Sequence, residues 1–299
     1  MSAQDDNDNK VSQEGYGTTG HSWDGIEEWN NPMPRWWVWT FYITIAWGIL
    51  YTIAYPAWPL IERATPGLLG QSTRADVAAD IAAVNERNAG LNEALAGIEL
   101  ASLSDNADLQ GYAVNKGASV FLNNCSQCHG AGAAGVQASG YPNLLDDDWL
   151  WGGEIDEIAY TVRNGIRNEQ SFDSHYSEMP AYGDILEEDE ITAVVHYVRS
   201  ISNQEHEATL AAAGAETFLN ECSACHGENG MGDQSLGAPN LTDAIWLYGG
   251  SIETLTETVV NARFGVMPAW SEEFRGASGL TDAEINAVAA YVHQLGGGE

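Results

Sequence analysis

The chain has 299 residues, of which 43 are acidic and 11 are lysine or arginine, so its formal net charge at pH 7 is −32. A surface this negative would repel the phosphate backbone of a nucleic acid, which excludes a nucleic-acid partner. We attribute most of the charge to solvation in a saline habitat, because the charge has no evident focus along the chain. Electrostatic steering of a basic partner protein is the alternative.

The first apolar element is a run without charged residues from Trp36 to Tyr55. At the rise of an α-helix, this run is long enough to cross the hydrocarbon layer of a bilayer. Both ends carry aromatic residues typical of membrane interfaces: Trp36, Trp37, Trp39, Tyr51, Tyr55 and Trp58. Pro56 and Pro59 would stop the helix. We therefore predict a transmembrane anchor over residues 36–58, with a buried helix of a soluble protein as the alternative.

Residues 59–109 follow as a linker in which one set of positions recurs at alternating spacings of four and three. All but one of these positions are apolar: Val77, Ile81, Val84, Asn88, Leu91, Leu95 and Ile98. The pattern predicts one amphipathic helix over residues 74–98. Its narrow apolar seam needs a packing partner, which is either the next domain of this chain or another subunit.

Two pentapeptides use every cysteine in the chain: Cys125-Ser126-Gln127-Cys128-His129 and Cys222-Ser223-Ala224-Cys225-His226. In such a C-x-x-C-H motif, both cysteines form thioethers to the vinyl groups of a haem, and the histidine is an axial ligand of the iron. A redox dithiol or a zinc site also uses C-x-x-C, but neither explains the adjoining histidine in both motifs. We predict two covalently bound haem c groups.

The sequence around the motifs is repeated, over residues 110–203 and 204–299. Pro142-Asn143-Leu144 returns as Pro239-Asn240-Leu241, and Met179-Pro180-Ala181 returns as Met267-Pro268-Ala269. Each copy predicts an entry helix before its motif, a glycine-rich loop, a middle helix and a closing helix. The closing helices, around residues 189–198 and 282–292, carry apolar residues on one face. We expect each copy to close on itself around its haem, which would supply much of the core.

The repeat resembles class I cytochromes c, and this resemblance makes Met179 and Met267 the second axial ligands, opposite His129 and His226. The alternative is that both methionines fill gaps in the core. A thioether ligand raises the reduction potential of the iron, as suits an electron acceptor. Met231 is expected to be an ordinary loop residue, whereas His175 could compete with Met179 for the first iron.

The resemblance also implies that the carbonyl groups of Pro142 and Pro239 accept hydrogen bonds from the ligating histidines, which would orient the imidazole rings. Arg163, Arg167 and Arg263 stand in surroundings poor in cations. Each could pair with a haem propionate or form an ordinary surface ion pair, and the sequence leaves both roles open.

The N-terminal region makes the resemblance more specific. It contains Trp23-Asp24-Gly25, then Asn30-Asn31-Pro32-Met33-Pro34-Arg35-Trp36-Trp37, then Phe41-Tyr42-Ile43-Thr44. With one anchor and two C-x-x-C-H domains, the chain resembles the dihaem subunit, subunit III, of cbb3-type cytochrome c oxidases. The implied fold is mainly α, with one N-terminal transmembrane helix followed by two class I cytochrome c domains in tandem.

The resemblance further implies electron transfer from donor c-type cytochromes, through two haem c groups, toward an oxygen-reducing, proton-pumping subunit. The implied partners are the catalytic haem-copper subunit and the monohaem cytochrome c subunit. We expect no oxygen-reducing centre in this chain, because that centre needs intramembrane histidines and the anchor has none. A dihaem peroxidase and a freestanding membrane-tethered shuttle are the rival functions, and the first would need an open iron position.

The anchor should be uncleaved, because the polar and acidic residues 1–35 precede it and no small-residue cleavage site follows. Positive charge near the anchor is too balanced to set its orientation. Bacteria attach haem c covalently on the periplasmic side. We therefore expect a single-pass protein of the bacterial inner membrane, with residues 1–35 cytoplasmic and both haem domains periplasmic.

Overall fold

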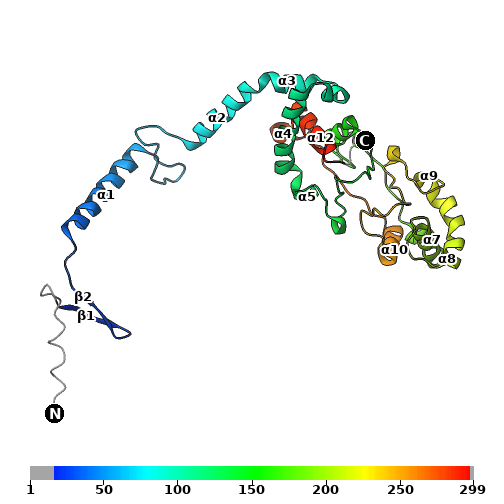
Figure 1. Cartoon of the computed structure of the whole chain (residues 1–299), viewed down its shortest axis with the longest axis horizontal. Coiled ribbons are helices and arrows are strands. Elements are labelled where there is room, and N and C mark those ends of the chain that lie inside the picture. Colours follow the sequence, from blue (N-terminus) through cyan, green and yellow to red (C-terminus); the bar gives the residue numbers. More distant parts are fainter. Residues whose placement is uncertain (1–16, 297–299) are drawn as a thin grey trace, which may run out of the picture. The chain divides into compact units, whose positions relative to one another are not determined.

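The computed structural model describes residues 17–296, which divide between Glu86 and Arg87 into two compact units (Figure 1). Helices dominate the described part of the chain, as predicted. The first unit holds a β-hairpin, one long apolar helix and helix α2; the second holds both C-x-x-C-H motifs.

The hairpin pairs β1 (Thr18–Trp23) with β2 (Ile26–Trp29) in antiparallel register. The two turn residues, Asp24 and Gly25, have φ of 52° and 82°, the left-handed conformation that a tight two-residue turn requires. The sequence analysis missed these strands, although an Asp-Gly pair between short runs with aromatic residues is a recognised hairpin signal.

Helix α1 (Arg35–Ala54) begins directly after Pro34 and has no buried residue. By length and composition alone, it is long and apolar enough to cross a membrane. The helix ends at Ala54, two residues before Pro56, which was expected to stop it because proline cannot continue a helix. The hydroxyl groups of Thr40, Thr44 and Thr52 donate to carbonyl groups of the preceding helical turn, which satisfies them without water.

The predicted single helix over residues 74–98 is two helices, α2 (Thr73–Arg87) and α3 (Ala89–Gly97). Asn88 separates them with φ −97° and ψ 2°, outside the helical region. Leu95 is fully buried within the second unit, and its carbonyl accepts a hydrogen bond of 2.9 Å from Asn286. The α3 half of the seam therefore packs on this chain's own domain, while Val77, Ile81 and Val84 of α2 are 42–56% exposed.

The second unit consists of short helices joined by loops. In chain order they are α3, η1 (Leu100–Asp105), α4 (Ala107–Asn124), α5 (Ser126–His129), η2 (Gln137–Ser139), α6 (Ile155–Asn164), η3 (Tyr182–Asp184), α7 (Glu188–Ile201), α8 (Ala208–Thr217), η4 (Phe218–Cys222), α9 (Ser223–His226), η5 (Gln234–Leu236), α10 (Ile252–Asn261), α11 (Glu272–Arg275), η6 (Gly276–Ser278) and α12 (Asp282–His293). Each copy thus has the predicted entry, middle and closing helices: α4, α6 and α7 in the first, and α8, α10 and α12 in the second.

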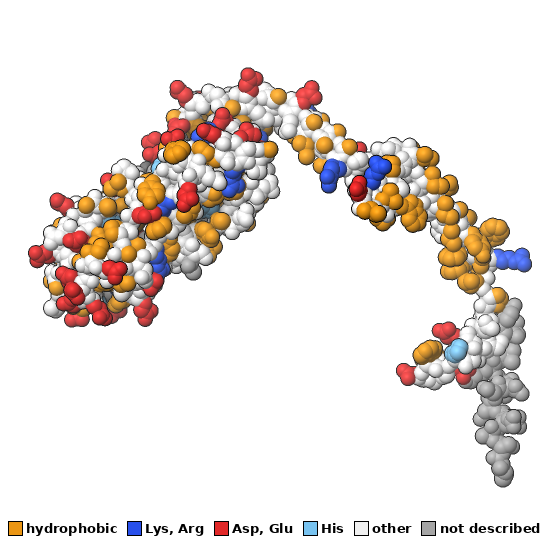
Figure 2. All heavy atoms as spheres, turned by 180° about the vertical axis from the view of Figure 1, so that it is seen from behind, with side chains coloured by type: hydrophobic (Ala, Val, Ile, Leu, Met, Phe, Trp, Pro, Cys, Tyr) orange, Lys and Arg blue, Asp and Glu red, His pale blue; other side chains and the backbone are white. Residues whose placement is uncertain are grey.

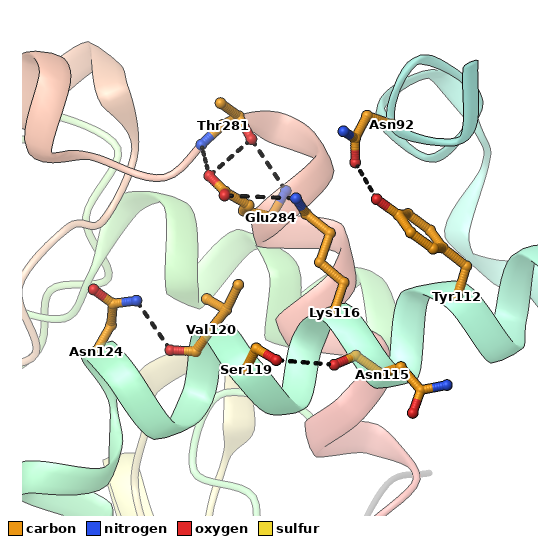
Figure 3. Close-up of polar contacts among 9 residues, drawn as sticks. All are labelled: Asn92, Tyr112, Asn115, Lys116, Ser119, Val120, Asn124, Thr281 and Glu284. Atoms are coloured by element: carbon orange, nitrogen blue, oxygen red, sulfur yellow. Dashed lines mark hydrogen bonds and ion pairs between the residues drawn. The ribbon is translucent and has the colours of Figure 1, made fainter. Parts of the chain in front are cut away.

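The closing helices are exchanged between the copies. Helix α12, from the second copy, packs against α4 and α6 of the first, and α7, from the first copy, packs against α8 and α10 of the second. Figure 3 shows the α4–α12 contact, where Lys116 of α4 and Glu284 of α12 form an ion pair of 3.6 Å. The expectation that each copy closes on itself is therefore wrong. The boundaries 110–203 and 204–299 describe sequence repeats rather than packing units.

The two exchanged helix pairs cross in the same way. A Cβ on Gly117 of α4 would collide with the carbonyl of Ala287 in α12, and a Cβ on Gly214 of α8 would collide with the carbonyl of Ala193 in α7. An aromatic pair accompanies each crossing: Phe121–Tyr291, with ring centroids 5.5 Å apart, and Tyr197–Phe218, 5.0 Å apart. Equivalent residues make equivalent contacts, so the second copy repeats the packing of the first.

The short connection between α7 and α8 favours the exchange. Consecutive helices joined by a short loop pack side by side. Arg199 fastens this loop by donating to the carbonyl of Glu205 at 2.8 Å, and the Nδ1 of His196 accepts from the Glu207 amide at 3.0 Å. With α7 paired to α8, the equivalent surface of α4 is left for α12. One cytochrome-like unit, near residues 177–262, is thereby inserted into the other.

We predict that Gly117→Ala destabilises the protein by about 1–3 kcal/mol, because the added methyl group overpacks the α4–α12 crossing. Gly111→Ala is the matched control on the same helix, since nothing lies within 4 Å of a Cβ there. That control should stabilise by roughly 0.5–1 kcal/mol through helix propensity. Thermal unfolding of the full chain in detergent measures both, and equal stability of the two variants would contradict the crossing.

Candidate functional site

Each motif histidine is oriented by a proline carbonyl. The short helices α5 and α9 carry His129 and His226 at their ends. The Nδ1 atom of His129 lies 3.3 Å from the carbonyl oxygen of Pro142, and that of His226 lies 3.1 Å from the carbonyl of Pro239. The predicted proline contacts are thus confirmed. With Nδ1 protonated and donating, Nε2 keeps the lone pair that a metal needs.

Burial lowers the pKa of both histidines below the ordinary 6.5, against the opposing effect of the proline carbonyls. A lowered pKa means that both imidazoles are neutral at pH 7. Only the neutral ring can bind a metal ion through Nε2. The two side chains are therefore in the protonation state of axial ligands.

The cysteines are all free thiols in this structure. Burial raises the pKa of Cys125 and of Cys222 to about 11, with their motif partners adding to the effect. A redox dithiol depends on a thiol with a lowered pKa, so this environment argues against that alternative. Among residues 17–296, no three Cys, His, Asp or Glu side chains converge as a zinc site would require.

The second motif lines a largely apolar cavity, which we call the second cavity. Cys222, Cys225 and His226 lie on its wall together with Pro239. Its apolar lining includes Val194, Val195, Val198, Phe218, Trp246, Leu255 and Val259. The same wall includes Met179, which comes from the first copy. Two thiols, an oriented histidine and a thioether around an apolar space are the groups that fit a haem c.

Met267, from the second copy, packs among residues of the first copy. It packs against the buried cluster that contains Cys125 and Ala133. Its backbone pairs with Ile166 of the first copy through two hydrogen bonds of 2.9 and 3.0 Å. The structure thus places Met179 on the wall of the cavity that His226 lines, and packs Met267 against the cluster that contains Cys125 of the first motif. These positions differ from the expected pairing of each methionine with the motif of its own copy, because the methionine loops cross over with the closing helices.

The remaining candidates have other contacts. His175 stacks on Trp151 with ring centroids 4.4 Å apart, and its Nε2 lies 3.1 Å from the hydroxyl of Thr161. Since Met179 lies at the second motif, competition between His175 and Met179 for the first iron has no structural basis. Met231 is 68% exposed, as expected for a loop residue.

The arginines divide between the two predicted roles. Arg163 of α6 forms an ion pair with Asp282 of α12, which adds a further link between the copies. Arg263 lies 4.0 Å from Glu257 and stacks over the ring of Tyr248. Both Arg263 and Arg167 line the second cavity.

The copies also meet through a second reciprocal contact, which the sequence analysis missed. The ring of Trp151 covers Gly237, and the ring of Tyr248 covers Gly140. Trp151 and Tyr248 each stand two positions after an equivalent tryptophan, so comparison of the two repeats could have indicated this contact. A hydrogen bond of 2.7 Å from the side chain of Gln137 to the carbonyl of Trp246 joins the same region.

Asp148 is a partly buried carboxylate at this junction and on the wall of the second cavity. Its pKa is raised to about 6, chiefly by burial and in part by the nearby charges of Asp243, Asp146 and Asp147. Acidic side chains are numerous on the visible face of the second unit (Figure 2).

Comparisons with known proteins agree with this arrangement. Residues 15–62 match the family model for the N-terminal domain of cytochrome oxidase-cbb3, FixP, and residues 114–202 and 211–296 each match cytochrome c. The cbb3-type cytochrome c oxidase subunit CcoP of Cereibacter sphaeroides is 58% identical over 284 residues, 94% of this chain and 95% of that protein. CcoP of Rhodobacter capsulatus is 51% identical over 287 residues, covering 94% and 96%. Subunit FixP of Azorhizobium caulinodans is 47% identical over 286 residues, covering 95% and 94%.

The repeated C-x-x-C-H motifs, oriented histidines and cytochrome c matches define a c-type cytochrome with two haem-binding repeats. The N-terminal match and the relatives narrow the class. The chain belongs to the CcoP/FixP family of cbb3-type cytochrome c oxidase subunits, which confirms the family predicted from the sequence.

We predict that Asp148→Asn raises the melting temperature at pH 8 by a few degrees. The native pKa is raised from 3.8 to about 6, so the cost of burying the charge is absent below pH 3.8 and complete above about pH 6. The gain should therefore shrink as the pH falls from 6 toward 4. Asp173→Asn, which removes an exposed carboxylate that is not among the groups raising the pKa of Asp148, is the control. A gain independent of pH would contradict the buried charge.

Proposed function

We propose that this chain is the membrane-anchored, dihaem electron-transfer subunit of a cbb3-type oxidase. The observation that carries the proposal is the second cavity, where Cys222, Cys225 and His226 share an apolar wall with Met179. The first motif has the same ligand types, with Met267 packed against its cluster. Each site supplies covalent attachment and two axial ligands, and this set suits electron transfer rather than substrate binding.

Two haem c groups would be held across the copies. Cys125 and Cys128 would attach the first haem, with His129 and Met267 as ligands. The second would be attached by Cys222 and Cys225, with His226 and Met179 as ligands. Bound haem supplies an iron that gains and loses one electron. The protein excludes water with its apolar walls and orients each imidazole through a proline carbonyl, which strengthens the histidine as a donor.

Electrons would enter from donor c-type cytochromes, pass between the two haems, and leave toward the monohaem subunit and the catalytic haem-copper subunit. The reciprocal contacts of Trp151 with Gly237 and of Tyr248 with Gly140 hold the two copies together, which favours transfer between them. The chain would not reduce oxygen itself: α1 has no histidine for a haem-copper centre.

Helix α1 would anchor the protein in the bacterial inner membrane as a single span. Its exposed apolar surface and internally bonded threonines support this placement. Because haem c is attached in the periplasm, both haem domains would be periplasmic and residues 1–35 cytoplasmic. A dihaem peroxidase is disfavoured, because a methionine at each site would leave no open iron position. A freestanding shuttle is disfavoured by the oxidase-type N-terminal match.

We predict that Met179→His changes the haem attached at Cys222 and Cys225, not the one attached at Cys125 and Cys128. A second histidine ligand would abolish the sulfur-to-iron charge-transfer band of that haem and lower its potential. Redox-titrated near-infrared spectra measure both properties. Met267→His is the reciprocal control and should alter the other haem.

The assignment to each haem can be made in a Cys222→Ala, Cys225→Ala background, which keeps only the haem of the first motif. In that background Met267→His should remove the remaining band, and Met179→His should leave it. The reverse result would show that each methionine serves its own copy.

The oxidase assignment predicts that gentle detergent extraction co-purifies the chain with a multi-span subunit. That fraction should consume oxygen when supplied with a reduced donor cytochrome. Recovery of this chain alone in full yield, with the oxygen uptake in a different fraction, would favour the freestanding shuttle.

A further inference from the structure

One guanidinium group joins the two segments that lead into the methionines. The Nε of Arg167 donates to the carbonyl of Gly265 at 2.8 Å, and its Nη1 donates to the carbonyl of Ser177 at 2.7 Å. Ser177 stands two residues before Met179, and Gly265 stands two residues before Met267. The two acceptors are therefore equivalent positions of the two copies, held by a single side chain.

The backbone around Arg167 is tied to the same segments. Ile166, its neighbour, pairs with Met267 in both directions, and the Arg167 amide donates to the carbonyl of His175 at 2.7 Å. Arg167 has φ 51°, in the left-handed region that non-glycine residues rarely adopt. Its guanidinium carbon lies 5.6 Å from the centre of the Phe264 ring. The side chain is thus fixed from several directions.

The placement of this charge is unusual for a cation in so acidic a chain. Among residues 17–296, the ion pairs involve Lys116, Arg163 and Arg263, and none involves Arg167. Its charge is instead partly buried on the wall of the second cavity, beside Met179. Two neutral carbonyl groups are fixed acceptors, so the planar fork of the guanidinium sets their separation.

The loop before Met179 also leads to the guanidinium of Arg167. Between α6 and Met179 the first copy is longer than the second copy between α10 and Met267. The extra residues turn back so that His175 pairs beside Ile166 and Ser177 reaches the guanidinium. Despite the different lengths, the two methionine segments arrive at the same group.

We propose that Arg167 is a shared positioning residue, which holds both methionine segments so that both thioethers stay on their irons. This inference rests on the proposed His/Met ligation. It assigns no direct contact with iron to Arg167; the residue acts through Ser177 and Gly265. Loss of the two hydrogen bonds would loosen Met179 and Met267 together, although they belong to different haems.

The test uses imidazole, which competes with methionine for oxidised haem iron, in titrations of the full haem-loaded chain in detergent. Arg167→Gln should bind imidazole about tenfold more tightly at both haems, which corresponds to about 1.4 kcal/mol. Loss of the near-infrared charge-transfer band reports displacement of each methionine. The Met179→His and Met267→His backgrounds each retain one methionine, so the band then reports one haem at a time.

Arg263→Gln is the matched control. It removes the same charge from the same cavity wall, but Arg263 makes its ion pair with Glu257 rather than bridging the two methionine segments. That variant can shift the potentials through the lost charge and should leave imidazole affinity within about twofold of wild type. Arg167→Lys, which keeps the charge and cannot span both carbonyl groups as a fork, should fall between wild type and Arg167→Gln.

Three results would overturn the proposal: unchanged imidazole affinity at both haems in Arg167→Gln, a change at only one haem, or an equal change in Arg263→Gln. If Arg167→Gln fails to incorporate haem, the Arg167→Lys titration decides by the same criteria. Failure of the underlying ligation looks different, because the wild-type protein would then lack the charge-transfer band at one or both haems before any imidazole is added.

Discussion

The second unit depends on two close helix crossings, each made between copies rather than within one. At Gly117 and at Gly214 the helices approach so closely that a single methyl group would strike a backbone carbonyl of the partner helix. These crossings bring α12 to the first motif and place α7 beside the second. Because the methionines precede the closing helices in sequence, exchange of the helices also exchanges the methionines. With the proposed ligands, neither haem site would be complete within its own repeat.

This topology joins the stability of the two sites. The α7–α8 hairpin is local in sequence and costs little chain entropy to form. The α4–α12 pair closes a loop that contains the whole of the inserted cytochrome-like unit near residues 177–262. Forming this pair therefore costs more chain entropy. Contacts such as Arg163 with Asp282 and Lys116 with Glu284 lie at that distant closure. Disruption of the first site therefore leaves the inserted unit with its own helix pair, whereas disruption of the inserted unit removes the connection on which the first depends.

The local chemistry of the motifs was predictable from the sequence. The helix against which each closing helix packs was not. The motif residues, the proline carbonyl contacts and the apolar faces of the closing helices follow from short patterns, and the structure contains them. The partner of each closing helix could not be predicted, because the entry helices α4 and α8 present nearly identical surfaces around the equivalent residues Gly117 and Gly214. Periodicity shows that Val194 or Val288 is buried without showing where. The break at Asn88 was missed for a related reason: a heptad pattern continues through one residue that is not helical.

The internal repeat explains why one arginine can serve two sites. Equivalent segments related by approximate two-fold symmetry approach each other near the relating axis, and a single side chain there can contact both. Ser177 and Gly265 meet Arg167 in this way, as Trp151 and Tyr248 meet equivalent glycines of the opposite copy. A reciprocal contact is made twice, by equivalent residues of the two copies. A contact at the relating axis is made only once, so it has no counterpart in the repeat. Arg263 follows the middle helix of the second copy much as Arg167 follows that of the first, so comparison of the repeats alone would not show which of them joins the two methionine segments.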